Sequence, residues 1–229
     1  MISEHLSVLS GARLFRGLSE SDIEALLRCL ESRVASYPRN ECVAIEGEPL
    51  TSVGIVLCGT LTIYKENAAG NQVVLNVLRP GDMFGETAAF VSSPKWPATI
   101  RAESASGVLH LPPDRLIEQC QRLCPWHKAL LKNLLGAVSE RALLLNQKVT
   151  YLTIKSMRGK LSAYLLDLYK KTGSRDLVLP LNRNQMADFL NVSRPSMSRE
   201  MCRMRDEGII DFHLSNVRIL DPERLLEGR

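Results

Sequence analysis

The stretch 182–210 constrains the fold more than any other part of the chain, because it contains the signals for two short helices joined by a tight turn. Asn182 predicts the start of the first helix, and Gln185, three residues later, completes a capping box. The helix is predicted to run to Leu190. Asn191 then stands where such a turn needs a residue that tolerates positive φ.

The second helix of this pair is predicted to begin at Ser193, an N-cap residue, with Pro195 in the first turn, where a missing N–H costs little. One face of the second helix is apolar and consists of Met197, Met201 and Met204. This face is expected to pack on Met186, Phe189 and Leu190 of the first helix. The opposite face is rich in arginine and serine, and we predict that it contacts DNA through Ser193, Arg194, Ser196, Arg199 and Arg203.

Arginine can bridge two acceptors of guanine, and serine can bond a base or a phosphate. The alternative is a solvated surface helix with ordinary charges, but the capped pair and the tight turn favour a helix-turn-helix. Gly208 is predicted to end the second helix. The β-type runs 209–212 and 217–220 then resemble the hairpin wing of a winged helix.

Length and charge indicate two domains that differ in net charge. A chain of 229 residues can bury two cores. Residues 1–149 carry 15 Lys and Arg and 15 Asp and Glu, whereas residues 150–229 carry 14 against 10. The excess positive charge therefore lies in the C-terminal part, where a double-stranded DNA partner is expected.

The sequence predicts a cytoplasmic protein without a membrane span. No basic stretch followed by an apolar region opens the chain, and no run of about 18 apolar residues occurs. The six cysteines are scattered through expected secondary structure, which is typical of reduced thiols.

The N-terminal part is predicted to be a β-sandwich or jelly roll. An amphipathic helix opens it after a capping box of Ser19 and Asp22. Glycines then recur at intervals of 11 or 12 residues from Gly47 to Gly81, between β-rich runs that include 53–57, 61–64 and 73–78.

In this order, with the segment RPGDMFGE at 79–86 and the helix-turn-helix behind it, the chain resembles the cyclic-AMP receptor protein and fumarate-nitrate-reduction regulator (CRP/FNR) superfamily. The resemblance implies an α+β fold with an effector-sensing β-roll (1–123), a dimerisation helix (124–152) and a winged helix-turn-helix (153–229). It implies a transcription regulator, not an enzyme, that responds to a small-molecule or gas effector and acts with RNA polymerase.

In cyclic-nucleotide-binding members of this superfamily, a Gly-Glu pair, here Gly85 and Glu86, contacts the ribose, and an Arg-Ser pair grips the phosphate. At the place of the Arg-Ser pair this chain has Trp96 and Pro97. Tryptophan brings no charge and proline has no backbone N–H to donate to a phosphate. We therefore predict that cyclic AMP is not the effector. An alternative for Glu86 is a structural role, as the N-terminal acid of a short helix over 87–90.

A heptad repeat predicts the dimer helix, because its apolar positions alternate steps of four and three; they are Leu131, Leu135, Val138, Ala142, Leu145, Val149 and Leu152. The resemblance implies that the same helix closes the effector pocket, with Arg141, Leu145 and Asn146 at positions that face the effector. A two-fold dimer predicts a palindromic operator. The linker 153–156 is the expected hinge, before a helix over 157–172 that Gly173 ends.

Several sensing chemistries are open. Met1 to Arg28 holds no cysteine, which argues against an iron–sulfur cluster, and Cys120 and Cys124 near His127 are more typical of packing than of a thiol switch or metal site. Parts of the chain resemble regulators of the nitrosative stress response in anaerobic bacteria, some of which use haem, so a haem-dependent nitric oxide sensor is the alternative, with His5, His110 and His127 as candidate ligands. A cupin-type enzyme would need more histidines in the β region than His110.

Overall fold

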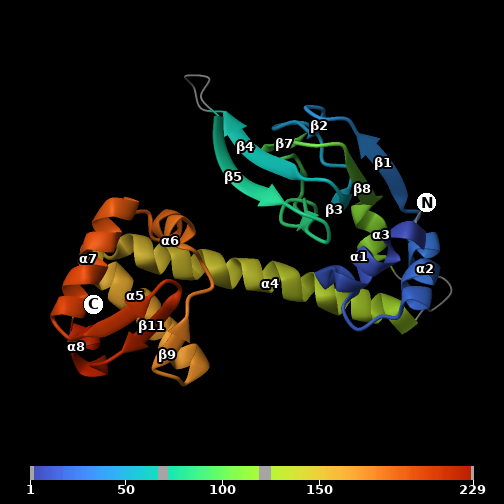
Figure 1. The fold of residues 1–229 in the computed structure, drawn as a ribbon. Helices are drawn as coiled ribbons and strands as arrows, with labels where there is room; N and C mark the ends of the chain where they lie inside the picture. Colours follow the sequence, from blue (N-terminus) through green and yellow to red (C-terminus); the bar gives the residue numbers. More distant parts are fainter. Residues whose placement is uncertain (1–2, 67–71, 119–124, 228–229) are drawn as a thin grey trace. The chain divides into compact units, whose positions relative to one another are not determined.

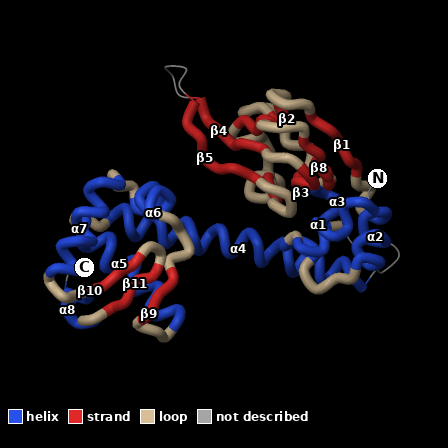
Figure 2. The backbone as a smooth tube through the Cα atoms, viewed as in Figure 1, coloured by secondary structure: helices blue, strands red, loops and turns tan. Residues whose placement is uncertain are grey.

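The computed structural model describes residues 3–66, 72–118 and 125–227, which belong to two compact units, Met1–Glu140 and Arg141–Arg229. The first unit holds the larger sheets and the second is mainly helical, as the ribbon in Figure 1 and the tube in Figure 2 show. Each unit has a hydrophobic core of its own. The predicted α+β class is confirmed.

Two four-stranded antiparallel sheets form the β-roll of the first unit, with strand orders β1-β8-β3-β6 and β2-β7-β4-β5. Side chains of both sheets, such as Ile55 and Ile100, meet in one core. The first strand, β1, was not predicted, since it lies before the β-rich runs that the sequence shows. The strands are β1 Arg33–Tyr37, β2 Cys42–Ala44, β3 Val53–Cys58, β4 Leu61–Glu66, β5 Gln72–Leu78, β6 Met83–Phe84, β7 Thr99–Ala102 and β8 Ser106–Leu111.

Short helices pack together against the roll, as Figure 1 shows. They are η1 Ser3–His5, α1 Leu6–Gly11, η2 Arg13–Phe15, α2 Glu20–Cys29 and α3 Pro113–Ile117. The predicted capping box of α2 is confirmed, since the Ser19 hydroxyl accepts from the Asp22 N–H and the Asp22 carboxylate accepts from the Ser19 N–H. Its apolar side, including Leu26, is buried in the core of the β-roll.

Helix α4 (Pro125–Thr153) is the longest element and has two apolar faces. One face packs into the core of the first unit through Leu130, Leu134 and Ala137. The heptad positions lie elsewhere: Leu131 and Val138 are half-buried, and Leu135, Ala142, Leu145, Val149 and Leu152 are exposed. An apolar row this exposed is unusual on the surface of a monomeric protein.

The second unit is a helical domain with a small sheet. Its elements are α5 Met157–Thr172, β9 Asp176–Val178, α6 Arg183–Leu190, α7 Arg194–Asp206, β10 Ile210–His213, β11 Asn216–Ile219 and α8 Pro222–Glu227. Gly173 ends α5 in the left-handed conformation (φ 68°), as predicted. The predicted hairpin of β10 and β11 is confirmed, and β9 adds a third strand to it, in the order β10-β11-β9. None of the described helices is long and apolar enough to cross a bilayer.

Candidate DNA interface and effector pocket

The predicted helix-turn-helix is present as α6 and α7. Asn182 caps α6 by accepting from the Gln185 N–H at 3.0 Å, and the Gln185 side chain accepts from the Asn182 N–H at 3.0 Å. Asn191 ends the helix with φ 51° and ψ 59°. The turn is therefore made by the left-handed residue that the sequence predicts.

Helix α7 starts where Ser193 accepts from the Ser196 N–H at 3.4 Å, with Pro195 in the first turn. The three methionines are buried, as predicted, in one core with Met186 and Leu190 of α6, and are Met197, Met201 and Met204. Because this face packs inward, the rotation of α7 about its axis is fixed.

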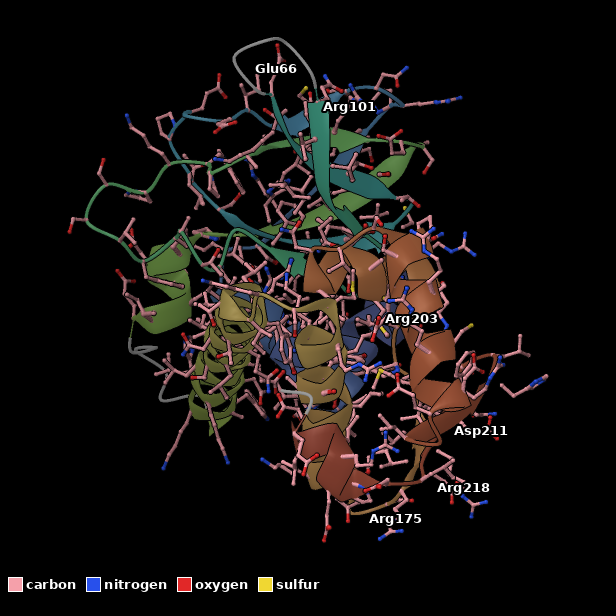
Figure 3. The ribbon with its side chains drawn as sticks, turned by 90° about the vertical axis from the view of Figure 1, so that its left-hand side faces the viewer. Glu66, Arg101, Arg175, Arg203, Asp211 and Arg218 are labelled. Carbon is pink, nitrogen blue, oxygen red and sulfur yellow. The ribbon has the colours of Figure 1, made fainter. Side chains whose placement is uncertain are left out.

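Polar and basic side chains cover the outward face of α7. Arg194, Arg199 and Arg203 are exposed, and Figure 3 shows Arg203 on the surface of the second unit. The Ser193 hydroxyl donates to the Ser196 hydroxyl (2.8 Å), which accepts from Arg199 (3.1 Å). Ser193 therefore also acts as a cap, while the arginines extend guanidinium groups that could contact bases or phosphates.

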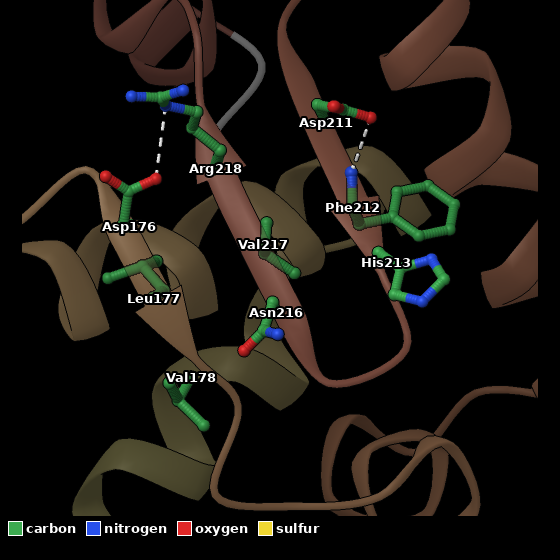
Figure 4. Close-up of a pocket in the computed structure, with 9 residues that line it drawn as sticks. All are labelled: Asp176, Leu177, Val178, Asp211, Phe212, His213, Asn216, Val217 and Arg218. Carbon is green, nitrogen blue, oxygen red and sulfur yellow. Dashed lines mark hydrogen bonds and ion pairs between the residues drawn. The ribbon is translucent and has the colours of Figure 1, made fainter.

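The wing is braced against the start of α6. Arg183 donates to the Leu214 carbonyl at 3.1 Å and lies over the Phe212 ring, 5.1 Å from its centroid. Figure 4 shows the face of the three-stranded sheet, where Arg218 pairs with Asp176 at 3.1 Å. The wing and the helix-turn-helix thus form one structural unit.

The predicted effector residues of the β-roll lie beside a tryptophan. Trp96 is buried in the core, with its ring centroid 6.0 Å from that of Phe84. Gly85 has φ 87°, and a Cβ atom there would come within 3.0 Å of the Trp96 ring. Glu86 is buried and Pro97 is exposed. The indole therefore occupies the space directly against Gly85 of the Gly-Glu pair.

The alternative structural role of Glu86 in a helix is wrong. Residues 86–90 form turns, not a helix, with the Ala88 N–H donating to the Gly85 carbonyl at 3.1 Å. The left-handed backbone at Gly85 directs the chain into these turns.

The remaining predicted pocket residues lie on α4, in its part that belongs to the second unit. Leu145 and Asn146 are exposed and Arg141 is half-buried. Their roles toward an effector stay predictions.

The candidate haem and thiol ligands differ in their surroundings. His110 is buried on β8 and both of its ring nitrogens are engaged, Nε2 with the Tyr37 hydroxyl (2.9 Å) and Nδ1 with the Ser52 hydroxyl (2.8 Å). His127 Nε2 donates to the Arg115 carbonyl at 3.1 Å. Cys120 and Cys124 lie outside the described residues, which contain no cluster of three or more groups suited to a metal ion.

A β-roll joined by a long helix to a winged helix-turn-helix with an arginine-rich outer helix is the architecture of a DNA-binding transcription regulator. Residues 34–123 match the cyclic nucleotide-binding domain family, and residues 159–227 match the Crp-like helix-turn-helix domain family. The chain belongs to the CRP/FNR superfamily of transcription regulators.

Its relatives are regulators too. The chain is 26% identical over 226 residues to the CRP-like cAMP-activated global transcriptional regulator of Mycobacterium tuberculosis. The aligned region covers 95% of this chain and 96% of the relative. It is 23% identical over 218 residues to the transcriptional activator protein FnrA of Stutzerimonas stutzeri (93% and 86%). A CooA variant from Carboxydothermus hydrogenoformans has the same fold, with a TM-score of 0.56, 19% identity and coverage of 93% and 91%. These relatives agree with the prediction that the chain is not an enzyme.

Proposed function

We propose that two copies of this chain bind a palindromic operator and respond to an effector that is not cyclic AMP. Helix α7 is the main support for DNA binding. Its methionine face is buried, and its arginines are exposed on the opposite side of a capped helix-turn-helix. In this proposal the chain consists of a sensing β-roll (1–123), a dimerisation helix (124–152) and a DNA-binding domain (153–229). RNA polymerase is the expected further partner.

Selection of bound duplexes from a random pool by the full-length protein tests operator binding. We expect enrichment of an inverted repeat whose half-sites are centred about one helical turn apart, because a two-fold dimer presents two α7 helices. Enrichment of single, unrepeated half-sites would contradict the dimeric mode, and no enrichment at all would contradict sequence-specific binding.

The exposed row on α4 supports the dimer. Its heptad spacing is that of a two-stranded coiled coil, in which such side chains are covered by a partner helix. Native mass spectrometry of the protein purified without oxygen would show the dimer and any retained effector together.

The packing of Trp96 supports an effector other than cyclic AMP. An indole against Gly85 offers no positive charge to a cyclic phosphate, and a buried phosphate without charged partners costs several kcal/mol. Calorimetry with cyclic AMP should show no binding in the micromolar range. Trp96, Pro97, Arg141, Leu145 and Asn146 are the contacts to substitute once an effector is identified.

Haem is the alternative proposal for the sensing group. His110 does not fit as an axial ligand, because binding iron would require breaking one of its two buried hydrogen bonds. His5 and His127 stay candidates without an assignment. A haem titration that leaves the Soret band of free haem unchanged would remove this proposal.

A further inference from the structure

Arg158 links helix α5 by ion pairs to α7 and to the C-cap residue of α7. It is the second residue of α5, directly after the linker that follows α4. Its Nε donates to Glu200 at 2.7 Å, and its two terminal nitrogens donate to the two carboxylate oxygens of Glu207 at 2.8 and 2.6 Å. We call Arg158, Glu200 and Glu207 the Arg158 cluster.

The two carboxylates hold α7 at separate places along its axis. Glu200 lies in the middle of the helix and Glu207 is its C-cap, so seven residues, or about 10 Å of helix, separate them. Seven residues are nearly two full turns, so both side chains lie on the same face. A single contact would leave α7 able to pivot, whereas two contacts from one planar guanidinium fix its direction.

Glu207 is stabilised at the C-terminus of α7 by contacts with other helices. A carboxylate at a helix C-terminus is disfavoured by the helix dipole. Hydrogen bonds from Arg158 keep the pKa of Glu207 below its usual value, and Arg224 of α8 lies 3.7 Å away. The residue therefore depends on cations from two other helices.

The Arg158 cluster adjoins the predicted DNA-contacting face. Glu200 also accepts from Arg203 at 3.4 Å. Two residues after Arg158, the buried Lys160 ammonium donates to the carbonyl of Leu190, the last residue of α6, at 3.0 Å. The first turn of α5 therefore holds both helices of the helix-turn-helix.

We infer that Arg158 is a positioning residue for operator recognition, which sets the direction of α7 through Glu200 and Glu207 without touching DNA itself. The inference rests on the proposed function, because it concerns how the same surface selects its operator.

The test compares Arg158→Gln, Glu207→Gln and the double variant with the wild-type full-length protein. The probes are the duplex that the wild type enriches from a random pool and a scrambled duplex of the same composition, with affinity measured by fluorescence anisotropy. Arg28→Gln is the matched control, because Arg28 forms an exposed pair with Glu24 in the first unit.

Glu207→Gln is the decisive variant, since it removes a negative charge. If general electrostatics governed binding, this variant would bind both duplexes more tightly. We expect instead that each single variant weakens operator binding about tenfold while scrambled-duplex binding changes by less than about twofold, and that the double variant is no weaker than either. Arg158→Lys, which keeps the charge but not the bidentate contact, should fall between the wild type and Arg158→Gln.

Unchanged or tighter operator binding by Glu207→Gln would overturn the inference, and so would an equal loss on both duplexes. Circular dichroism checks folding; if Arg158→Gln does not fold, Glu207→Gln still decides, because its side chain is 37% exposed.

Hydrogen exchange separates this inference from the proposed function. If the wild type enriches no duplex, sequence-specific binding fails, and the Arg158 cluster is then judged by the amides of α7. Faster exchange in the last turns of α7 in Arg158→Gln, with α6 unchanged, supports positioning by Arg158. Unchanged exchange in α7 would overturn it.

Discussion

At the scale of single residues, His110 shows how a buried polar group acts on stability. Its ring lies between the hydroxyls of Tyr37 and Ser52. Burial, and secondly the positive charge of Arg33, lower its pKa from 6.5 to about 4. The folded first unit therefore favours the neutral ring.

We expect acidification to destabilise the first unit through this residue. With the folded pKa below the unfolded one, the stabilisation is complete above pH 6.5 and is lost as the pH falls toward 4, a change on the order of 3 kcal/mol. Urea unfolding between pH 7 and 4 should give a shallower pH dependence for His110→Gln than for the wild type. Parallel curves for the two proteins would contradict the role of His110.

Arg199 offers the second prediction at this scale. Its guanidinium is exposed and is held by the Ser196 hydroxyl at 3.1 Å. Arg199→Ala should weaken operator binding by about 1–3 kcal/mol and relax the preference at one base pair. The measurement is anisotropy on operator duplexes with single base changes, with Arg28→Ala as the control. An unchanged pattern of preferences across these duplexes would exclude a base-reading role.

Residues whose roles depend on near neighbours in the chain could be predicted from the sequence. The caps at Asn182 and Ser193 and the left-handed Asn191 each follow from contacts within a few residues. The Arg158 cluster could not, because Arg158 is 42 and 49 residues from its two partners. The helix expected after Glu86 was wrong because the left-handed Gly85 and the tertiary position of Trp96 decide that turn.

At the scale of elements, α4 carries the prediction on assembly. Leu145 and Leu143 are almost equally exposed, at 62% and 63%, but only Leu145 is a heptad position. Leu145→Glu should therefore convert the dimer to a monomer, since it places a charge in the helix–helix seam.

Leu143→Glu is the matched control, and it should leave the dimer intact. Sedimentation velocity measures both. Neither substitution should lower the stability of the monomer by more than about 0.5 kcal/mol, because both side chains are exposed in it. Dimers of both variants, or monomers of both, would show that the heptad row is not the interface.

Among the elements, those with a strong period, a cap or a local hairpin partner were predictable, and two strands that pair with distant segments were not. The bounds of α5 follow from its spacing and from Gly173, a local signal. β9 has three residues and exists through pairing with β11, some 40 residues further along. β1 was missed as well; it pairs with β8, from Arg33 opposite His110 to Tyr37 opposite Ser106, across about 70 residues of sequence. Pairing over such distances leaves little trace in a local pattern.

At the scale of the whole molecule, the two separate cores predict two unfolding transitions. Leu109 belongs to the first core and Leu165 to the second, and both are fully buried. Leu109→Ala and Leu165→Ala should each cost about 2–5 kcal/mol, and each should lower a different transition in calorimetry. A single transition that moves with either substitution would show that the units unfold together.

The overall architecture could be predicted because the order of the glycine-punctuated strands, the heptad row and the helix-turn-helix resembles one superfamily throughout the chain. The effector could not. Its chemistry depends on side chains from distant segments, and Trp96 shows which ligand group is disfavoured without showing which is preferred.

The placement of the aromatic residues has an optical consequence. The chain has two tryptophans, Trp96 and Trp126, and both pack in the core of the first unit, whereas the second unit has tyrosines such as Tyr151 and Tyr164. Indole emission excited at the red edge of the absorption band therefore reports on the first unit, which holds the β-roll and the start of α4. The arrival of an effector can be followed in the unlabelled protein without interference from the DNA-binding unit.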